Sequence, residues 1–352
     1  MHSHSHHIIR RQVPLKTANT FGIDVRADYF AEISVPDDLP KLMDTEMYQT
    51  KPRYIIGGGS NILLVDDYPG LIIKNSISGI SVLSENKKNV FLRVGAGVIW
   101  DHLVRYSLDN NWGGLENLSM IPGRTGAAPI QNIGAYGVEF EQVFKSLKAI
   151  SLESGQSKEF DHSQCRFGYR DSIFKTLEKN KWIITSVTIK LDKRHKINTN
   201  YGNLKETLTK SGIHQPTIHD VSNAVRHIRS SKLPDPSIIG NAGSFFKNPI
   251  ITNSFFKELR ESSPDIPGYP ADDTHIKIPA AWLIDQCGLK GKRMGDAGIH
   301  DRHALILVNH GHATGQQLLD LSETVQSDVF KQFGIKLEPE VNIIPSLKGK
   351  RK

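Results

Sequence analysis

The sequence predicts an α+β protein in which strands and helices do not alternate regularly. Short apolar runs that end in glycine dominate the first two-thirds of the chain, which is typical of strands joined by tight turns. Longer amphipathic segments dominate the last third and are typical of helices. A chain of 352 residues is long enough for two or three domains.

Four segments of the first part are expected to be strands. Three apolar runs end in glycine or a small polar residue, at 52–60, 70–76 and 89–97. Segment 182–191 alternates instead, with Val187, Ile189 and Leu191 on one face and polar residues on the other.

Four segments are expected to be helices: 98–114, 217–237, 279–291 and 315–334. Prolines close the second of them, and Pro279 suits the first helical position of the third. In the last one an apolar stripe is followed by Gly334, a typical helix stop, and we expect the stripe to be core: Leu318, Leu321, Val325 and Val329. The change in composition near 195–220 suggests a domain boundary there.

The composition indicates a soluble globular protein, with 38% hydrophobic and 23% charged residues. No apolar run reaches the roughly 18 residues of a membrane span, so we expect no membrane association. The net charge of +7 comes mostly from Arg10, Arg11 and the tail 348–352. The rest of the chain shows no basic stripe, which argues against nucleic-acid binding.

The chain ends and the cysteines indicate a cytoplasmic protein. The N-terminus lacks the apolar segment of a secretory signal, and its histidines suggest a flexible end rather than a metal site, so no metal is expected. Cys165 and Cys287 are far apart, which fits a reducing compartment. Both are expected to be small hydrophobes rather than catalytic thiols.

Two glycine-rich segments are candidates for the chemistry. Residues 57–61 (GGGSN) follow a strand, where a backbone turn can cradle phosphate, but they match neither a Walker loop nor a Rossmann fingerprint. Residues 114–139 combine glycine, alanine and proline with few charges. The two segments could form the walls of a groove for a flat cofactor and its pyrophosphate, or they could be tight turns only.

Seven motifs occur in order along the chain: TFGID, GGGSN, GLENLSMIPGRTGAAPIQNIGAYGVE, CRFGYRDSIFK, GNAGSFFKNP, KIPAAWLIDQCGLKG and LEPEV. Together they closely resemble the UDP-N-acetylenolpyruvoylglucosamine reductase family over about 20–344, nearly the whole chain. The resemblance implies an FAD-binding domain of the vanillyl-alcohol-oxidase type, with two α+β subdomains, followed by an α/β substrate-binding domain. The corresponding ranges are a flexible 1–19, an FAD domain at 20–195 divided near 70, a substrate domain at 215–345 and a basic tail at 346–352.

The resemblance implies FAD as cofactor and NADPH as reductant. Neither glycine-rich segment contains the His or Cys that some relatives in the superfamily use to attach flavin, so the FAD is expected to be non-covalent. The residues expected to line it are Gly57, Gly58, Gly59, Ser60, Asn61, Ile121, Pro122, Gly123, Gly126, Ala127, Gln131, Asn132, Gly134, Ala135 and Tyr136.

The implied reaction reduces UDP-N-acetylglucosamine enolpyruvate to UDP-N-acetylmuramate for peptidoglycan synthesis. Arg170 matches the family residue that steadies the substrate's carboxylate and enolate, Ser244 the proton donor, and Glu340 the third catalytic residue. For an unrecognised chain, a salt bridge of Arg170 with Asp171 or another carboxylate would be the preferred interpretation. Glu338 and Glu340 would share one face of a strand, so spacing alone does not choose between them.

The substrate implied is a small nucleotide sugar bound by a monomer. The residues expected to hold it are Tyr201, Lys232, Asn248 and Gln286, and Tyr201 places the chain in the form of the family with a tyrosine lid. Two alternatives remain: a flavin oxidase of the same superfamily, and a basic anion-binding protein that acts through its charged ends.

Overall fold

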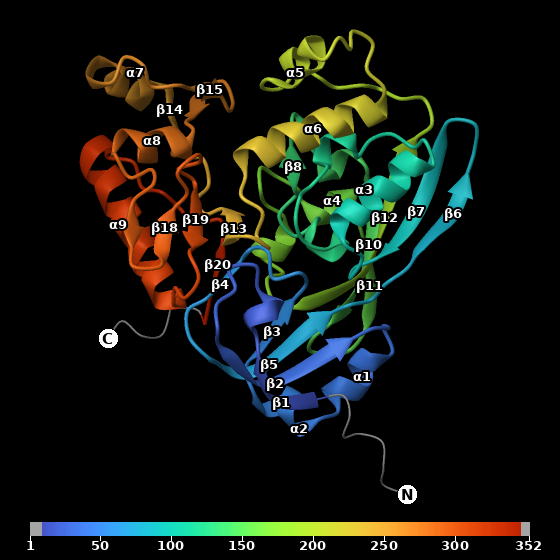
Figure 1. Ribbon diagram of the computed structural model, residues 1–352. Helices are drawn as coiled ribbons and strands as arrows, with labels where there is room; N and C mark the ends of the chain where they lie inside the picture. Colours follow the sequence, from blue (N-terminus) through green and yellow to red (C-terminus); the bar gives the residue numbers. More distant parts are fainter. Residues whose placement is uncertain (1–8, 346–352) are drawn as a thin grey trace, which may run out of the picture. The chain divides into compact units, whose positions relative to one another are not determined.

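The structure is a computed structural model that describes residues 9–345 in two compact units. Unit 1 comprises 9–13, 27–58 and 69–231, and unit 2 comprises 14–26, 59–68 and 232–345 (Figure 1). The histidine-rich residues 1–8 and the basic tail 346–352 lie outside the described residues. Within 9–345 no helix is long and apolar enough to cross a membrane.

The first sheet of unit 1 has the strand order β1-β2-β5-β3. Helices α1 and α2 lie beside it (Figure 1) and cover an aliphatic core that includes Leu39, Leu42 and Ile73. The bounds are β1 Ile9–Pro14, β2 Arg26–Ile33, α1 Asp38–Met43, α2 Glu46–Thr50, β3 Arg53–Ile56 and β5 Tyr68–Asn75. Residues 9–14 were expected to be flexible, but they pair at the edge of this sheet.

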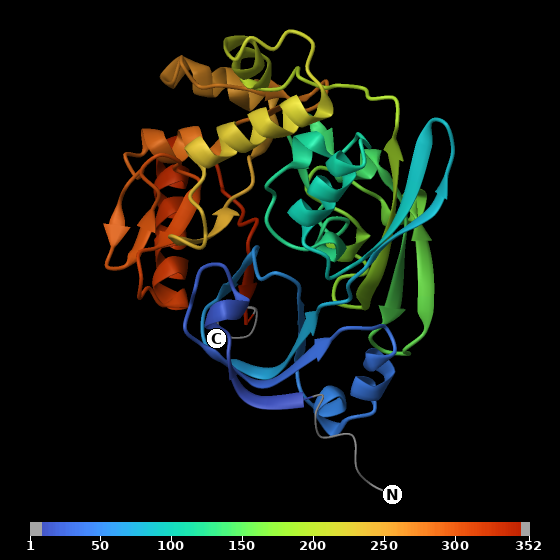
Figure 2. The same cartoon turned by 45° about the vertical axis from the view of Figure 1, so that its right-hand side comes forward.

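The second sheet of unit 1 has the order β11-β10-β12-β7-β6, and the β6–β7 hairpin forms one edge of it (Figure 2). The alternation predicted for 182–191 is confirmed, because Val187, Ile189 and Leu191 are all buried on the core face of β12. The bounds are β6 Ile80–Glu85, β7 Asn89–Gly95, α3 Trp100–Asp109, β10 Phe144–Ser151, β11 Ser157–Asp161, α4 His162–Cys165 and β12 Trp182–Asp192.

Helices α5 Leu204–Lys210 and α6 Ile218–Lys232 complete unit 1. The guanidinium of Arg226 in α6 donates to both carboxylate oxygens of Asp101 in α3, at 2.6 and 3.0 Å. Burial opposes the ionisation of Asp101, but hydrogen bonds from Arg226 and from the Met120 backbone outweigh it and hold the pKa of Asp101 below its usual value. We expected α6 to open the C-terminal domain; these contacts instead tie it to unit 1.

Unit 2 is built on the antiparallel sheet β13-β19-β18-β17, with α9 lying along it (Figure 1). The predicted stripe of α9 is confirmed, since all four of its residues are fully buried. Each such side chain contributes about 1.5–3 kcal/mol by its burial. The bounds are β13 Gly240–Ser244, α8 Ala280–Gln286, β17 Arg293–Met294, β18 Ala297–Ile299, β19 Ile306–Asn309 and α9 Gly315–Phe333. Pro279 is the N-cap of α8, one position before the place predicted for it.

A small sheet and a parallel strand pair complete unit 2. The sheet β14-β16-β15 carries α7, and β20 pairs in parallel with β4. The bounds are β4 Ile62–Leu64, β14 Ile250–Thr252, α7 Asn253–Ser262, β15 Tyr269–Pro270, β16 His275–Lys277 and β20 Asn342–Ile344. Residues 14–26, which include the 3₁₀ turn η2 Lys16–Ala18, also belong here, because Asn309 donates to the Phe21 carbonyl at 2.9 Å and Phe21 packs on Phe245.

Candidate active site

The glycine-rich segment of unit 1 ends in a short hairpin, β8 Gly134–Ala135 and β9 Val138–Glu139. Its two turn residues, Tyr136 and Gly137, have φ values of +50° and +78°. Two consecutive left-handed residues are the requirement of a type I′ turn, and glycine meets it without strain. The hairpin register places Glu139 directly opposite Gly134.

The predicted catalytic Arg170 lies against this hairpin. Its Nη2 donates to the Gly134 carbonyl at 2.5 Å, and its Nη1 donates to the Asn132 carbonyl at 3.3 Å. Glu139 Oε1 lies 3.7 Å from Nη1 and forms an ion pair with it. Glu139, which the hairpin brings opposite Gly134, is therefore an acidic partner of Arg170. Since 20% of the Arg170 side chain is exposed, the guanidinium stays accessible to a ligand.

The backbone around Arg170 is strained. Arg170, Asn132 and Tyr136 have φ values of +53°, +44° and +50°. Left-handed conformations cost a non-glycine residue about 1–3 kcal/mol and cluster at functional sites. Three of them at one hairpin indicate that this region is built to hold particular side chains in place.

Several glycines of the segment are required by close contact within the protein itself. A Cβ on Gly126 would lie 2.5 Å from the Ala96 Cβ, and one on Gly134 would lie 2.8 Å from Arg170 Nη1. By contrast, a Cβ on Gly57 would meet the Arg124 side chain only at 3.5 Å, an ordinary contact. Of these three glycines, packing accounts for Gly126 and Gly134, and Gly57 is left for a ligand to explain.

Two half-buried arginines in unit 1 each have one buried guanidinium nitrogen without an acceptor in the described part of the chain. The Nε atoms of Arg124 and Arg229 are buried and have no hydrogen-bond partner among residues 9–345. Arg124 lies beside Gly57 and Gly58, and Arg229 donates to the Met120 carbonyl at 3.3 Å. Burial lowers the pKa of Arg229, while the nearby Tyr136 and Asp101 raise it. Both guanidinium groups donate from another nitrogen to a backbone carbonyl, of Gly97 and Met120, but each buried Nε still lacks an acceptor, which suits an anionic group such as the pyrophosphate of FAD.

The predicted lid residue Tyr201 lies over the same hairpin. A Cβ on Gly137 would come within 3.1 Å of the Tyr201 Cβ, and Asn198 donates to the Gly137 carbonyl at 3.1 Å. Burial raises the pKa of Tyr136; the positive charge of Arg229 lowers it and Tyr201 raises it further. The Tyr201 side chain is 55% exposed, so it lies at the surface of unit 1 and is available to a ligand.

Ser244 lies in unit 2, at the end of β13. The pairing of β13 with β19 contains a bulge between Asn241 and Ser244, and Gly243 within it has a φ of +70°. The Asn241 side chain accepts the Gly243 N–H at 3.0 Å and stabilises this bulge. The Ser244 hydroxyl is partly exposed and has no hydrogen-bond partner among residues 9–345.

Glu340 lies close to Ser244 in unit 2. Its backbone N–H donates to the Phe245 carbonyl at 2.8 Å, and its carbonyl accepts from Asn61 at 3.4 Å. The segment was considered as a strand, but it makes only an isolated bridge there. Glu338 forms an ion pair with Lys247 at 3.3 Å, so the two glutamates differ in their partners.

The remaining predicted substrate residues also lie in unit 2. The Asn248 side chain accepts the backbone N–H of Ala280 at 2.9 Å, so it caps α8, and Gln286 is the last residue of that helix. Lys232 lies near His303, whose Nδ1 is buried and unpartnered within the described part of the chain. Burial, His300 and Lys232 all lower the pKa of His303, which favours its neutral form beside the lysine.

The predicted site residues are thus distributed over both units. Arg170, Tyr201, Gly57, Gly58 and the predicted cofactor residues of 121–136 belong to unit 1. Gly59, Ser60, Asn61, Ser244, Glu340 and the other predicted substrate residues belong to unit 2. Gly59 contacts its own unit, because a Cβ on it would lie 2.0 Å from the Ala18 carbonyl oxygen.

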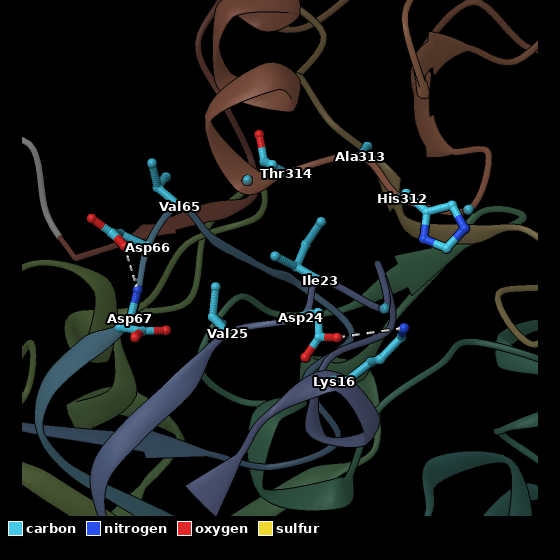
Figure 3. Close-up of a pocket in the computed structure, with 13 residues that line it drawn as sticks. Lys16, Ile23, Asp24, Val25, Val65, Asp66, Asp67, His312, Ala313 and Thr314 are labelled. Atoms are coloured by element: carbon cyan, nitrogen blue, oxygen red, sulfur yellow. Dashed lines mark hydrogen bonds and ion pairs between the residues drawn. The ribbon is translucent and has the colours of Figure 1, made fainter. Parts of the chain in front are cut away.

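A pocket of about 330 Å³ in unit 2 contains none of the predicted residues (Figure 3). The loop before α9, the loop after β4 and residues 22–25 surround it. Asp24 and Lys16 form an ion pair at 3.7 Å, and Asp66 accepts from the Asp67 backbone. These polar groups are satisfied by one another, and the pocket is therefore no candidate for the chemistry.

Sequence reasoning missed two groups that the structure brings to this region. Glu139 was part of a recognised motif, and the tyrosine–glycine turn before it could have paired it with Gly134. Arg229 had no such signal, because a charged residue in an amphipathic helix is normally assigned to the exposed face.

Comparison with known proteins decides the family. The FAD-binding domain model matches residues 28–161, and the model of the UDP-N-acetylenolpyruvoylglucosamine reductase C-terminal domain matches residues 235–344. The reductase of that name from Flavobacterium johnsoniae is 48% identical over 96% of this chain and 99% of its own length. The one from Chromobacterium violaceum is 47% identical over 95% and 98%.

The chain belongs to the UDP-N-acetylenolpyruvoylglucosamine reductase family. The structure of the UDP-N-acetylenolpyruvylglucosamine reductase (MurB) from Thermus caldophilus agrees with this, with a TM-score of 0.66 at 25% identity over 96% of this chain and all of that one. The expected α+β class is confirmed: an FAD-binding domain is followed by the C-terminal domain of this reductase family. Membership makes the chain an FAD-dependent oxidoreductase and supports NADPH as its reductant.

Proposed function

We propose that the protein reduces UDP-N-acetylglucosamine enolpyruvate to UDP-N-acetylmuramate in the cytoplasm, as a monomer, with NADPH as the electron source. The observation that carries the proposal is the guanidinium of Arg170, fixed at a glycine-rich hairpin in a chain of this reductase family. A cation fixed in this way can stabilise the negative charge of an enolate.

The reaction adds one hydride and one proton across the carbon–carbon double bond of the enol ether. The hydride goes to the terminal carbon and the proton to its neighbour, while NADPH is oxidised to NADP⁺. Enzymes of this reaction are named in the reverse direction, as dehydrogenases of a CH–OH donor. After hydride transfer and before protonation, negative charge develops next to the substrate carboxylate. A cation must stabilise this charge, and an acid must then donate the proton.

FAD, when bound, supplies the hydride transfer between NADPH and substrate. Gly57, Gly58 and Gly123 provide close backbone for its pyrophosphate. The Nε atoms of Arg124 and Arg229, which are buried and have no partner within 9–345, provide positive charge. The glycine-rich segments contain no His or Cys that could link the flavin, so this binding is non-covalent.

Arg170 binds the substrate carboxylate and stabilises the enolate, because its planar guanidinium offers two parallel N–H donors to a carboxylate. Ser244 donates the proton, and its lack of an internal partner leaves the hydroxyl free to point at a substrate. Glu340, one backbone hydrogen bond from Phe245, completes the catalytic set beside Ser244.

The substrate's diphosphate would be bound by Lys232 and Tyr201, with Asn248 and Gln286 as further polar contacts. A neutral His303 next to Lys232 adds a hydrogen-bonding group without adding charge. In this proposal 20–195 holds the cofactor and 215–345 holds the substrate, with α6 packed against the cofactor part.

The test is a pair of half-reactions on the purified holoenzyme. We expect a yellow protein that releases FAD on denaturation, whose flavin is reduced by NADPH and reoxidised by UDP-N-acetylglucosamine enolpyruvate with formation of the muramate. A protein that cannot be reconstituted with flavin would contradict the proposal. Rapid oxygen consumption with a simple alcohol, and no reaction with the nucleotide sugar, would establish the flavin oxidase instead.

A further inference from the structure

The turn of the β8–β9 hairpin is held from outside by two asparagine side chains. The carbonyls of its central residues, Tyr136 and Gly137, are not used by the hairpin, because its strands pair only through the residues on either side of the turn. The Asn117 Nδ2 donates to the Tyr136 carbonyl at 2.9 Å, and the Asn198 Nδ2 donates to the Gly137 carbonyl at 3.1 Å. Both carbonyls of the turn are therefore satisfied by side chains from distant parts of the chain.

Asn117 also binds residues 195–203, which carry Tyr201 and which we call the Tyr201 segment. Its Nδ2 donates a second hydrogen bond, to the Asn198 carbonyl, at 2.9 Å. Asn117 belongs to the short 3₁₀ helix η3 Glu116–Leu118 and is only 1% exposed. Because this amide is buried, its two hydrogen bonds join the turn to the Tyr201 segment, and water cannot readily replace them.

The Tyr201 segment packs closely on the turn. A Cβ on Gly137 would come within 3.1 Å of the Tyr201 Cβ and within 3.3 Å of the Asn198 Nδ2, so the absence of a side chain permits this approach. Ile197 and Tyr136 both pack against the apolar cluster formed by α5 and α6. Since more than half of the Tyr201 side chain is exposed, the contacts of its neighbours determine its position more than its own burial does.

We propose that Asn117 and Asn198 form an asparagine clasp that holds the Tyr201 segment on the β8–β9 turn and fixes the distance between Tyr201 and Arg170. The proposal rests on the proposed function, in which both of these side chains bind one substrate molecule. Arg170 contacts Gly134 in β8, and Tyr201 contacts the turn that follows this strand. The carboxylate and the diphosphate of the nucleotide sugar thus meet groups of fixed spacing. The buried Asn117 contributes to substrate affinity as a positioning residue.

The Asn198 side of the clasp can be removed without changing a core residue. Asn198→Ala deletes the donor to the Gly137 carbonyl and keeps the Asn198 carbonyl, which accepts from Asn117. The N–H that the Asn198 Oδ1 accepts belongs to the exposed Asn200, and water can accept it instead. We expect the KM for UDP-N-acetylglucosamine enolpyruvate to rise about three- to tenfold, as for the loss of one or two hydrogen bonds. The rate of flavin reduction by NADPH stays at its native value.

A double-mutant comparison tests whether the clasp acts through Tyr201. In a Tyr201→Ala background, Asn198→Ala adds nothing further to the KM, because the side chain that it positions is already gone. If Asn198→Ala leaves the KM native, or raises it equally with and without Tyr201, the inference is wrong.

Asn110→Ala is the matched control. The Asn110 Nδ2 donates to the Tyr106 carbonyl at 2.8 Å, so the variant loses the same kind of hydrogen bond. Both residues lie at the end of α3, and this bond joins no second segment. The control keeps the native KM and the native rates of both half-reactions.

Hydrogen exchange of the backbone amides, measured by mass spectrometry on the holoenzyme, tests the clasp without any activity. Asn117→Leu should raise exchange about tenfold in both 196–203 and 133–139, with β10 and β12 at their native rates. Asn198→Ala should raise it in the same two segments, so the test holds even if Asn117→Leu does not fold. Native exchange in Asn198→Ala, or a change in only one of the two segments, overturns the inference. If both segments loosen but the native enzyme is not reoxidised by the nucleotide sugar, only the function is overturned.

Discussion

Arg170 and Ser244 belong to the same proposed reaction, yet their surroundings are opposite. Arg170 has two backbone carbonyls, the carboxylate of Glu139 and a left-handed backbone that hold it in place. Ser244 ends a strand at a bulge, and its hydroxyl has no partner among the described residues. A cation that stabilises developing charge must be oriented in advance, whereas a proton donor must keep its proton available.

Removing the unpartnered hydroxyl gives the largest expected effect on rate. Ser244→Ala should slow reoxidation of the reduced enzyme by the enolpyruvyl substrate by about 10²–10⁴-fold, the usual contribution of a general acid. Flavin reduction by NADPH should not change, and the free energy of unfolding should stay within about 0.5 kcal/mol. Stopped-flow absorbance of the flavin separates the two steps. Equal slowing of both would exclude Ser244 as the proton donor.

Removing the fixed cation should cost somewhat less in rate but more in structure. Arg170→Met should slow the same step by about 10²–10³-fold. Because the variant leaves the Gly134 carbonyl and Glu139 without their partner, it should also unfold at lower urea concentration than Ser244→Ala. If the two variants are equally stable, the contacts of Arg170 do not hold the hairpin.

Two glycines distinguish packing from cofactor binding. Gly126→Ala should destabilise the protein by about 1–3 kcal/mol, because its Cβ would lie 2.5 Å from that of Ala96. Gly57→Ala should leave the unfolding free energy of the flavin-free protein unchanged and weaken FAD binding about tenfold, roughly 1.4 kcal/mol. Urea unfolding and fluorescence titration with FAD measure the two effects. If Gly57→Ala lowered the stability and Gly126→Ala weakened FAD binding, the roles given to these two glycines would be wrong.

A purely structural arginine sharpens the contrast further. Arg226 holds Asp101 with two hydrogen bonds, and the pKa of Asp101 is lowered, so this pair stabilises the fold above the unfolded pKa of about 3.9 and loses that contribution as pH falls. Asp101→Asn should therefore cost about 1–2 kcal/mol at neutral pH and little in acid. Asp109→Asn, at the exposed end of α3, is the control. A loss independent of pH would show that Asp101 contributes without its charge.

Much of the fold could be predicted from local patterns. Three local predictions are confirmed: the alternation of β12, the apolar stripe of α9 and the glycine at the end of α9. Each of them depends only on how a single helix or strand packs against its own core. The position of Pro279 was wrong by one residue, because cap geometry depends on the backbone angles of the loop before the helix. Residues 9–14 were misjudged for a different reason: this mostly exposed segment with two arginines has no strand pattern of its own, and it is ordered by pairing with β2.

The functional residues also divide into those that local sequence patterns predict and those that only tertiary contacts reveal. The sequence by itself determined the family, the glycine-rich segments and the candidates Arg170, Ser244 and Glu340, because these depend on residue types in a characteristic order. Only the tertiary structure decided that Arg170 pairs with Glu139 and that Gly126 is required by Ala96. It also decided that the Nε atoms of Arg124 and Arg229 are buried without an acceptor among the described residues. Such contacts join residues far apart in the chain, and their energies depend on distances that no local pattern of side chains contains.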